Sequence, residues 1–212
     1  MAPRGHSADD VARTALRILD DHGLPDLTMR RLATALEVQP SALYWHYPNK
    51  QTLLAELSDR IVQRMASDTG TDLRTEAHAL RDALLTYRDG AEVVSSTLAL
   101  GLGAPLAHDR LTAAVVADGF DVETASRAAT TVLHYVLGFA WHEQQRVQYD
   151  SVGVRGGGAG TADAGPVGDT SAGETGAGDA DAVGDDPVGL ATDDFAFGLD
   201  LIAAGLRARG RV

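Results

Sequence analysis

Apolar residues recur at helical spacing along most of the chain, and no segment alternates between apolar and polar positions as a strand does. A first amphipathic stretch follows Ser7, a residue type that caps helices, and ends at Gly23. A second stretch spans Met29 to Leu36 and follows the capping residue Thr28. This pattern predicts two helices that are joined by a short segment around Pro25.

A tight connection at Glu37 and a proline at position 40 predict a third helix of about two turns, which Pro48 ends. A longer helix then begins at Lys50, after its cap Asn49, and reaches residue 66. Two short helices that meet at a tight turn have the geometry of a helix-turn-helix, in which the last helix enters the major groove of DNA. Helical hairpins inside protein cores share this spacing, so the spacing alone leaves a purely structural role open.

Five more helices are predicted beyond Gly70, separated by breaks that contain glycine or proline. They span roughly residues 72–88, 93–100, 107–116, 122–148 and 194–209, with Asp194 as the cap of the last one. We therefore expect an all-α protein. Residues 1–50 form a three-helix helix-turn-helix unit, the helix 50–66 connects, and residues 67–212 form a larger helical domain.

The segment from Ser151 to Asp194 differs in composition from the rest of the chain. It contains twelve glycines and eight alanines, one arginine against nine acidic residues, and no aromatic residue. Such a segment buries too little apolar surface to offset the entropy lost on ordering. We expect a flexible acidic loop over residues 151–193, and its role, whether solvated linker, gate for a ligand or repulsion of DNA, stays open.

The formal net charge of −12 argues against a nucleic-acid partner at first sight. However, residues 1–66 carry eight basic and eight acidic side chains, so the acidity lies mostly outside the helix-turn-helix. The chain has no cysteine, no apolar run long enough to span a membrane and no apolar stretch near Met1 that resembles a signal peptide. These features predict a cytoplasmic protein without membrane contact.

The third helix carries side chains that a helix buried in a core would not. Gln39, Ser41, Tyr44, Trp45 and His46 lie within eight residues of one another. Tyrosine and histidine can donate to phosphate oxygens, and serine and glutamine can reach base edges. The alternative, in which the aromatic residues of this segment only cap a small core, stays open.

Two runs of residues, 27–33 and 43–50, followed by Leu53 and Leu54, resemble the helix-turn-helix of the TetR family of bacterial transcriptional regulators. The resemblance extends to the tetracycline-repressor branch through residues 84–91, 119–120, 137–138 and 197–202. It implies a ligand-responsive repressor that binds palindromic operator DNA as a homodimer. It also implies that the larger domain, 67–212, binds the ligand and forms the dimer.

The resemblance further implies which residues face DNA. They are Thr28, Arg30, Pro40, Ser41, Ala42, Tyr44, Trp45, His46 and Lys50. Base readers would lie near Arg30 and over residues 40–42, and loss of one should relax specificity at one position by roughly 1–3 kcal/mol. Tyr44, His46 and Lys50 would hold phosphates, so their loss should flatten the salt dependence by about one unit of slope per contact.

The ligand site departs from its tetracycline-binding relatives at two positions. The resemblance places Val94 where those relatives have a histidine that binds metal, and His142 where they have a carboxylate. A magnesium–tetracycline complex is therefore not expected, and no cofactor is implied. We expect a small apolar or aromatic effector, since most residues near the pocket are apolar: Met65, Leu80, Leu84, Val94, Leu98, Leu111, Leu133, Leu137 and His142.

The resemblance places the dimer contact on the long helix, 122–148, and on the terminal helix, 194–209. The small apolar stripe of the long helix consists of Ala125, Ala129, Val132, Val136 and Ala140. In the terminal helix, Gly198 and Gly205 would allow close approach. These stripes fit a core within one chain equally well.

Other functions find less support in the sequence. A helical enzyme would need a nucleophile with its base, paired carboxylates or metal-ligand spacing, and no such arrangement is present, so we expect no enzymatic activity. His134 and His142 lie two turns apart on one helix, about 12 Å, which is too far for one metal ion. A regulator that acts without a ligand, or as an activator, remains open.

Overall fold

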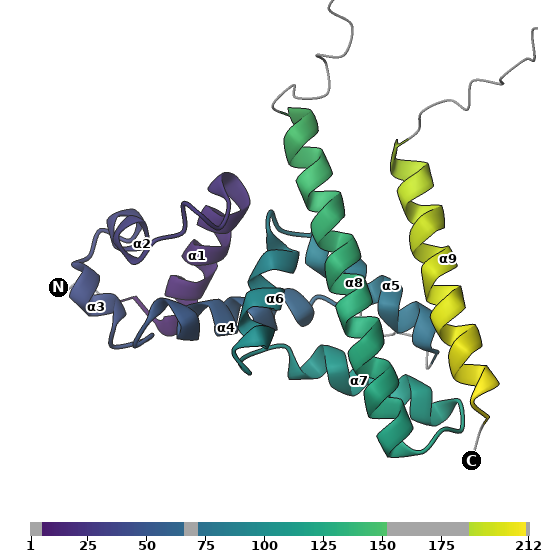
Figure 1. Cartoon of the computed structure of the whole chain (residues 1–212). Coiled ribbons are helices and arrows are strands. Elements are labelled where there is room, and N and C mark those ends of the chain that lie inside the picture. The colour runs from purple at the N-terminus through teal and green to yellow at the C-terminus, as the bar shows by residue number, and fades with distance from the viewer. Residues whose placement is uncertain (1–5, 66–71, 152–186, 211–212) are drawn as a thin grey trace, which may run out of the picture.

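The structure is a computed structural model that describes residues 6–65, 72–151 and 187–210. Every regular element in these ranges is a helix, which confirms the all-α fold (Figure 1). The helices are α1 (Ala8–His22), α2 (Met29–Ala35), α3 (Pro40–Leu43), α4 (Lys50–Val62), α5 (Leu73–Leu85), α6 (Gly90–Ala99), α7 (Pro105–Ala117), α8 (Val122–Ser151) and α9 (Pro187–Ala208). In Figure 1, α1 to α3 lie at one end of the molecule, and α4 leads from them into a body formed by α5 to α9.

The head, by which we mean α1, α2, α3 and the start of α4, surrounds an apolar core. Its buried residues include Val11, Ala15, Leu19, Leu27, Leu32, Leu43, Leu53 and Leu57. Burial of one leucine side chain contributes about 1.5–3 kcal/mol. This core therefore holds the three short helices together, none of which is long enough to be stable alone.

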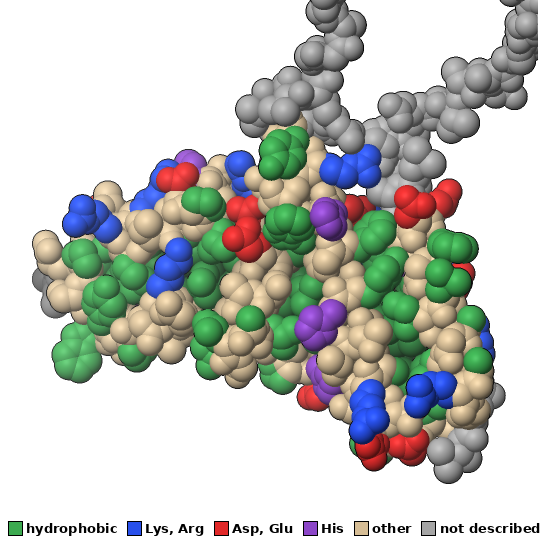
Figure 2. Space-filling view, viewed as in Figure 1, with side chains coloured by type: hydrophobic (Ala, Val, Ile, Leu, Met, Phe, Trp, Pro, Cys, Tyr) green, Lys and Arg blue, Asp and Glu red, His purple; other side chains and the backbone are tan. Residues whose placement is uncertain are grey.

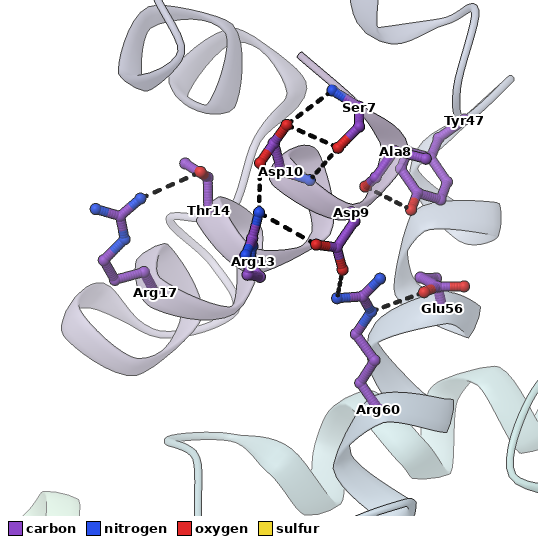
Figure 3. Close-up of polar contacts among 10 residues, drawn as sticks. All are labelled: Ser7, Ala8, Asp9, Asp10, Arg13, Thr14, Arg17, Tyr47, Glu56 and Arg60. Carbon is purple, nitrogen blue, oxygen red and sulfur yellow. Dashed lines mark hydrogen bonds and ion pairs between the residues drawn. The ribbon is translucent and has the colours of Figure 1, made fainter.

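Helix α1 begins at a reciprocal cap between Ser7 and Asp10 (Figure 3). The Ser7 hydroxyl accepts from the Asp10 N–H at 3.1 Å, and the Asp10 carboxylate accepts from the Ser7 N–H at 2.9 Å and from its hydroxyl at 2.7 Å. The hydrogen bonds from Ser7, with a further one from Arg13, lower the pKa of Asp10 to about 2. The ionised carboxylate thus stabilises the first turn of α1.

This cap predicts a dependence of stability on pH. Because the pKa of Asp10 lies below its ordinary value of 3.8, its contribution is complete above about pH 4 and is lost as the pH falls towards 2. We expect Asp10→Ala to lower the melting temperature at neutral pH, and the difference from the wild type to shrink as the pH falls through this window. The melting temperatures of both proteins are measured at each pH by thermal unfolding, with circular dichroism as the signal. A difference that stays constant down to pH ~2 would contradict the role of the ionised carboxylate.

Helix α4 and the segment before it are fastened to the start of α1 by one side chain each, Arg60 and Tyr47 (Figure 3). Arg60 donates to Asp9 at 2.7 Å and to Glu56, one turn before it on α4, at 2.7 Å. Partial burial opposes the charge of Arg60, but the hydrogen bonds to Glu56 and Asp9 outweigh it and raise the pKa of Arg60. The Tyr47 hydroxyl donates to the Ala8 carbonyl at 3.1 Å. A movement of α4 therefore carries the head with it.

Helix α8 lies at the centre of the body, where α5, α6 and α7 pack against it. Helix α9 runs antiparallel beside α8 and is anchored by the buried ring of Phe195 (Figure 1). This ring lies 5.5 Å from that of Tyr135, 5.2 Å from that of Phe139 and 5.0 Å from that of His78, between ring centroids. One turn later, a β-carbon on Gly198 would come within 2.8 Å of the Tyr135 ring, so glycine allows the close approach of α9 to α8.

Two boundaries predicted from the sequence are wrong. Helix α9 begins at Pro187, so Asp194 lies inside it rather than at its cap. A proline suits the first position of a helix, where no N–H is required. Helix α8 continues to Ser151. Residue 151 and residues 187–193 of the expected acidic loop, 151–193, are therefore helical, and residues 152–186 lie outside the described part of the chain.

Candidate DNA interface and ligand site

The turn between α2 and α3 sets the position of the candidate recognition segment. Glu37 adopts a left-handed backbone with φ of 55°, and the Val38 N–H donates to the Ala33 carbonyl at 3.0 Å. The α-helical part of α3 is one turn, not the two turns predicted. The N–H groups of His46 and Tyr47 both donate to the Leu43 carbonyl, at 3.0 and 2.9 Å, so the chain turns directly after Leu43.

Most of the residues predicted to face DNA are exposed, and only Lys50 is half-buried. The exposed residues are Thr28, Arg30, Pro40, Ser41, Ala42, Tyr44, Trp45 and His46. Trp45 is 89% exposed, although tryptophan is highly buried on average. Tyr47 is only 7% exposed, and burial raises its pKa. The core-capping alternative therefore holds for Tyr47 alone, and Trp45 offers a large apolar surface to a partner.

The charged groups near this surface differ in how they are held. Arg31 forms an ion pair with Asp26 at 2.7 Å, whereas Arg30 forms none with any residue that the structure describes. The Thr28 hydroxyl accepts from the Arg31 N–H at 3.1 Å, which leaves its own hydrogen free to donate. Lys50 is the first residue of α4. Figure 2 shows basic side chains over the end of the molecule formed by α1 to α4.

The head is tied to the body at the connection between α1 and α2. Asp89, which precedes α6 with a left-handed φ of 57°, is 5% exposed. One carboxylate oxygen accepts from the Leu24 N–H at 2.8 Å, and the other accepts from the Gln148 side chain at 2.6 Å. A β-carbon on Gly23 would lie 2.7 Å from this carboxylate, so glycine gives it room. One side chain thus joins the head to the last turns of α8.

We expect Asp89→Ala to weaken this junction. The change leaves the Leu24 N–H without its acceptor, which costs about 1–3 kcal/mol. Hydrogen exchange should therefore become faster at the amide of Leu24, and the melting temperature should fall. Asp89→Asn is the control, because asparagine tolerates the left-handed backbone and keeps one acceptor oxygen. Equal exchange rates of the Leu24 amide in the alanine variant and the wild type would show that Asp89 does not hold the head to the body.

The residues predicted to form the ligand site lie mainly in the packed core of the body. The buried ones are Met65, Leu80, Leu84, Val94, Leu111, Leu133 and Leu137, and Leu98 is half-buried against them. His142 is exposed. Seven of the nine side chains are therefore in contact with protein atoms on most sides, and two of the nine, Leu137 and His142, line the cavity between α6 and α8.

That cavity has a volume of about 390 Å³ and lies between α6 and α8. On α6 its wall consists of Glu92, Ser95, Ser96 and Ala99, and on α8 of Leu137, Gly138, Trp141 and His142. Of these eight residues, the sequence indicated only Leu137 and His142. The available signal was a tryptophan one turn after a glycine on the same face of a long helix. In the sequence both residues are typical of a helix, because the pattern does not show that α6 lies beside them.

The stripe of small residues predicted to pair α8 with its copy lies instead in the core of its own chain. Ala125, Ala129, Val132, Val136 and Ala140 have no exposed surface. The intrachain alternative is therefore correct for these residues. Exposed apolar side chains lie on α9, where Phe197 is 65% and Leu201 is 59% exposed. Figure 2 shows apolar side chains gathered between α8 and α9 on the outer face.

Two further properties concern only the described residues. None of their helices is long and apolar enough to cross a membrane. They also contain no cluster of three or more histidine, aspartate or glutamate side chains that could hold a metal ion. The ring of His134 is paired instead with the backbone carbonyl of Thr130, at 2.7 Å on its own helix.

Two parts of the chain match models of known protein families. Residues 12–57 match the model of "Bacterial regulatory proteins, tetR family", and residues 66–163 match the model of "Tetracyclin repressor-like, C-terminal domain". Among curated proteins, the chain is similar to the tetracycline repressor protein class E of Escherichia coli. The two are 35% identical over 153 residues, which cover 68% of this chain and 72% of the repressor.

Solved structures show the same similarity over nearly the whole chain. BioQ of Mycobacterium smegmatis has 39% identity and a TM-score of 0.74, with 97% of this chain and 99% of that chain covered. A structure of BioQ with its natural double-stranded DNA operator has 36% identity and a TM-score of 0.70, with 96% and 99% covered. The exposed segment that contains Trp45 lies within residues 12–57, which match the family model.

Proposed function

Because the chain belongs to the TetR family and is a helix-turn-helix transcriptional regulator, we propose that it is a ligand-responsive repressor. In this proposal a homodimer binds palindromic operator DNA in the cytoplasm. A small apolar or aromatic effector binds the body and releases the DNA. Residues 1–50 read the DNA, α4 connects, and residues 67–212 bind the effector and form the dimer.

The observation that carries the proposal is the exposure of the recognition segment. Trp45, Tyr44 and His46 are exposed on a head whose buried core consists of other residues. Tyrosine and histidine at such positions can hold phosphates, while Ser41 and its neighbours reach base edges. The same assignment is supported by the family match over residues 12–57 and by the overall likeness of the chain to a protein solved with its operator.

Two arguments support a homodimer: the number of contacts that DNA binding requires, and the exposed apolar side chains on the outer face of the body. One short recognition helix makes too few contacts for tight specific binding, and a two-fold dimer presents two of them about one DNA turn apart. Phe197 and Leu201 on α9, with the adjacent flank of α8, offer an apolar surface for the second copy. This surface replaces the stripe that the sequence suggested.

The route from effector to head runs through α4. Helix α6 packs extensively on α4, and the Ala104 N–H, in the connection between α6 and α7, donates to the Asp59 carboxylate of α4 at 2.7 Å. Since Arg60 fastens α4 to α1, a displacement of α6 is transmitted to the head. A coupling of about 1–3 kcal/mol is enough to change operator occupancy.

The effector is not expected to be a magnesium–tetracycline complex. Val94 is fully buried and carries no atom that can bind a metal. His142 lies on the exposed side of α8, at the edge of the cavity. A site with these side chains suits a ligand that is bound through apolar and aromatic contacts.

The test is selection of bound sequences from a random DNA pool with the full chain, followed by anisotropy titration of the selected duplex at several salt concentrations. We expect a palindrome, bound far more tightly than random duplex. Arg30→Ala should relax specificity at one position in each half-site, whereas Lys50→Ala should reduce the salt slope. Recovery of no palindrome would reject the proposal.

A further inference from the structure

The cavity between α6 and α8 has the size of a ligand site and is open to solvent, since six of its eight lining residues are exposed. Its volume, about 390 Å³, falls within the range of small-molecule pockets. It is separate from the packed core that the sequence indicated, since it shares only Leu137 and His142 with that set. Gly138 leaves part of it open, because a β-carbon there would meet no atom within 4 Å.

An aromatic surface forms one wall of the cavity. Trp141 is 40% exposed, although it lies in the middle of the body's central helix. The ring of His142 meets its edge, with 5.0 Å between centroids and 71° between ring planes. An exposed indole face gains most from a flat ring stacked on it or from a cation placed over it.

The opposite wall carries an uncompensated charge. In the described part of the chain, the Glu92 carboxylate forms no ion pair and no hydrogen bond, and no lysine or arginine lines the cavity. Glu92 lies in the first turn of α6, where the helix dipole favours the ionised form. The Ser96 hydroxyl is bonded to the Val93 carbonyl at 2.9 Å, so it does not neutralise Glu92.

We propose that this cavity binds a flat aromatic molecule that carries a protonated amine. The ring stacks on Trp141, and the amine donates to Glu92. This inference deepens the proposed function, on which its regulatory part rests, by giving the effector a positive charge and a site. Because Glu92 lies on α6, which packs on α4, an occupant that moves α6 acts on the helix that carries the head.

Calorimetric titration of the full chain with three probes of equal ring size tests whether the site prefers a positively charged ligand. The probes are naphthylmethylamine, naphthylmethanol and naphthylacetate. We expect the amine to bind about tenfold more tightly than the alcohol, and the acid to bind most weakly. Glu92→Gln should remove the preference for the amine and leave binding of the alcohol unchanged. Equal binding of all three probes by the wild type would overturn the inference.

Two substitutions that fill the cavity from opposite walls test whether the amine binds in this cavity. Ser95→Phe fills it from α6 and Gly138→Leu from α8, and both should abolish binding of the amine. Gly138→Ala is the control, because its methyl group has room, and it should retain binding. Amine binding that survives both fillings would overturn the site. Dissociation of both filled proteins into monomers in sedimentation would also overturn it, since the cavity would then belong to the contact between copies.

The failures of the two proposals can be told apart. If the chain selects a palindrome but binds no amine, the inference about the cavity is overturned and the proposed DNA binding stands. Binding of the amine with no change in operator affinity would overturn the effector role of this site. If no palindrome is recovered, the proposed function fails, whatever the probes do.

Discussion

Trp45→Ala is expected to weaken operator binding by about a thousandfold without lowering the melting temperature. A tryptophan at the centre of an interface contributes about 2 kcal/mol or more, and a dimer loses this contribution twice. Because Trp45 is 89% exposed in the free chain, its removal leaves no cavity and no unpaired group in the head. Anisotropy titration and thermal unfolding of the same preparation measure the two effects.

Tyr47→Phe is the matched control for Trp45→Ala, two residues away. Tyr47 is buried, and its hydroxyl donates to the Ala8 carbonyl, so its loss costs about 1 kcal/mol of stability. We expect a lower melting temperature and unchanged operator affinity at temperatures where the head is folded. If Trp45→Ala instead destabilised the protein and left DNA binding intact, the exposed segment would have a structural role and the account of the reader would be wrong.

Gly90→Ala is expected to destabilise the body by about 3 kcal/mol, which corresponds to a fall of about 10 °C in melting temperature. A β-carbon on this residue would overlap the carbonyl oxygen of Leu84. That oxygen also accepts from the Gln144 side chain at 3.0 Å, and the same side chain accepts from the Ala91 N–H at 3.2 Å. The turn between α5 and α6 cannot open without breaking this buried set of hydrogen bonds.

The control for Gly90→Ala is Gly138→Ala on α8. Its added methyl group meets no atom within 4 Å, and alanine is favoured over glycine inside a helix by about 1 kcal/mol. We expect Gly138→Ala to be neutral or slightly stabilising. Denaturant unfolding of both variants gives the comparison. Equal stabilities would show that the close contact between Gly90 and Leu84 is relieved by a small shift of the chain.

The helices of this protein could be predicted well from the sequence because most of them bury one apolar face. The spacing of Val11, Ala15 and Leu19 defines α1, and these residues are buried. The start of α9 was missed for a physical reason. Residues 187–193 contain proline, glycine and no apolar stripe, so composition indicated a loop, whereas Phe195 and Gly198 dock the helix on α8.

The candidate sites were predictable to different degrees. The residues proposed to face DNA include polar and aromatic side chains whose types are unsuited to a core, so their exposure could be inferred directly. Apolar residues such as Leu80 and Leu111 suggested a pocket, but apolar character indicates burial and does not distinguish a packed core from a cavity. The hollow beside Trp141 depends on the distance between two helices, which the sequence pattern does not contain.

The central claim, that two copies of this chain read a palindrome through the exposed segment around Trp45, can be tested with one titration. Anisotropy is measured for the selected operator and for a duplex in which one half-site is scrambled. We expect the operator to bind at least about a thousandfold more tightly than the scrambled duplex, with two chains per duplex. Equal affinity for the two duplexes, or a complex with one chain, would contradict it.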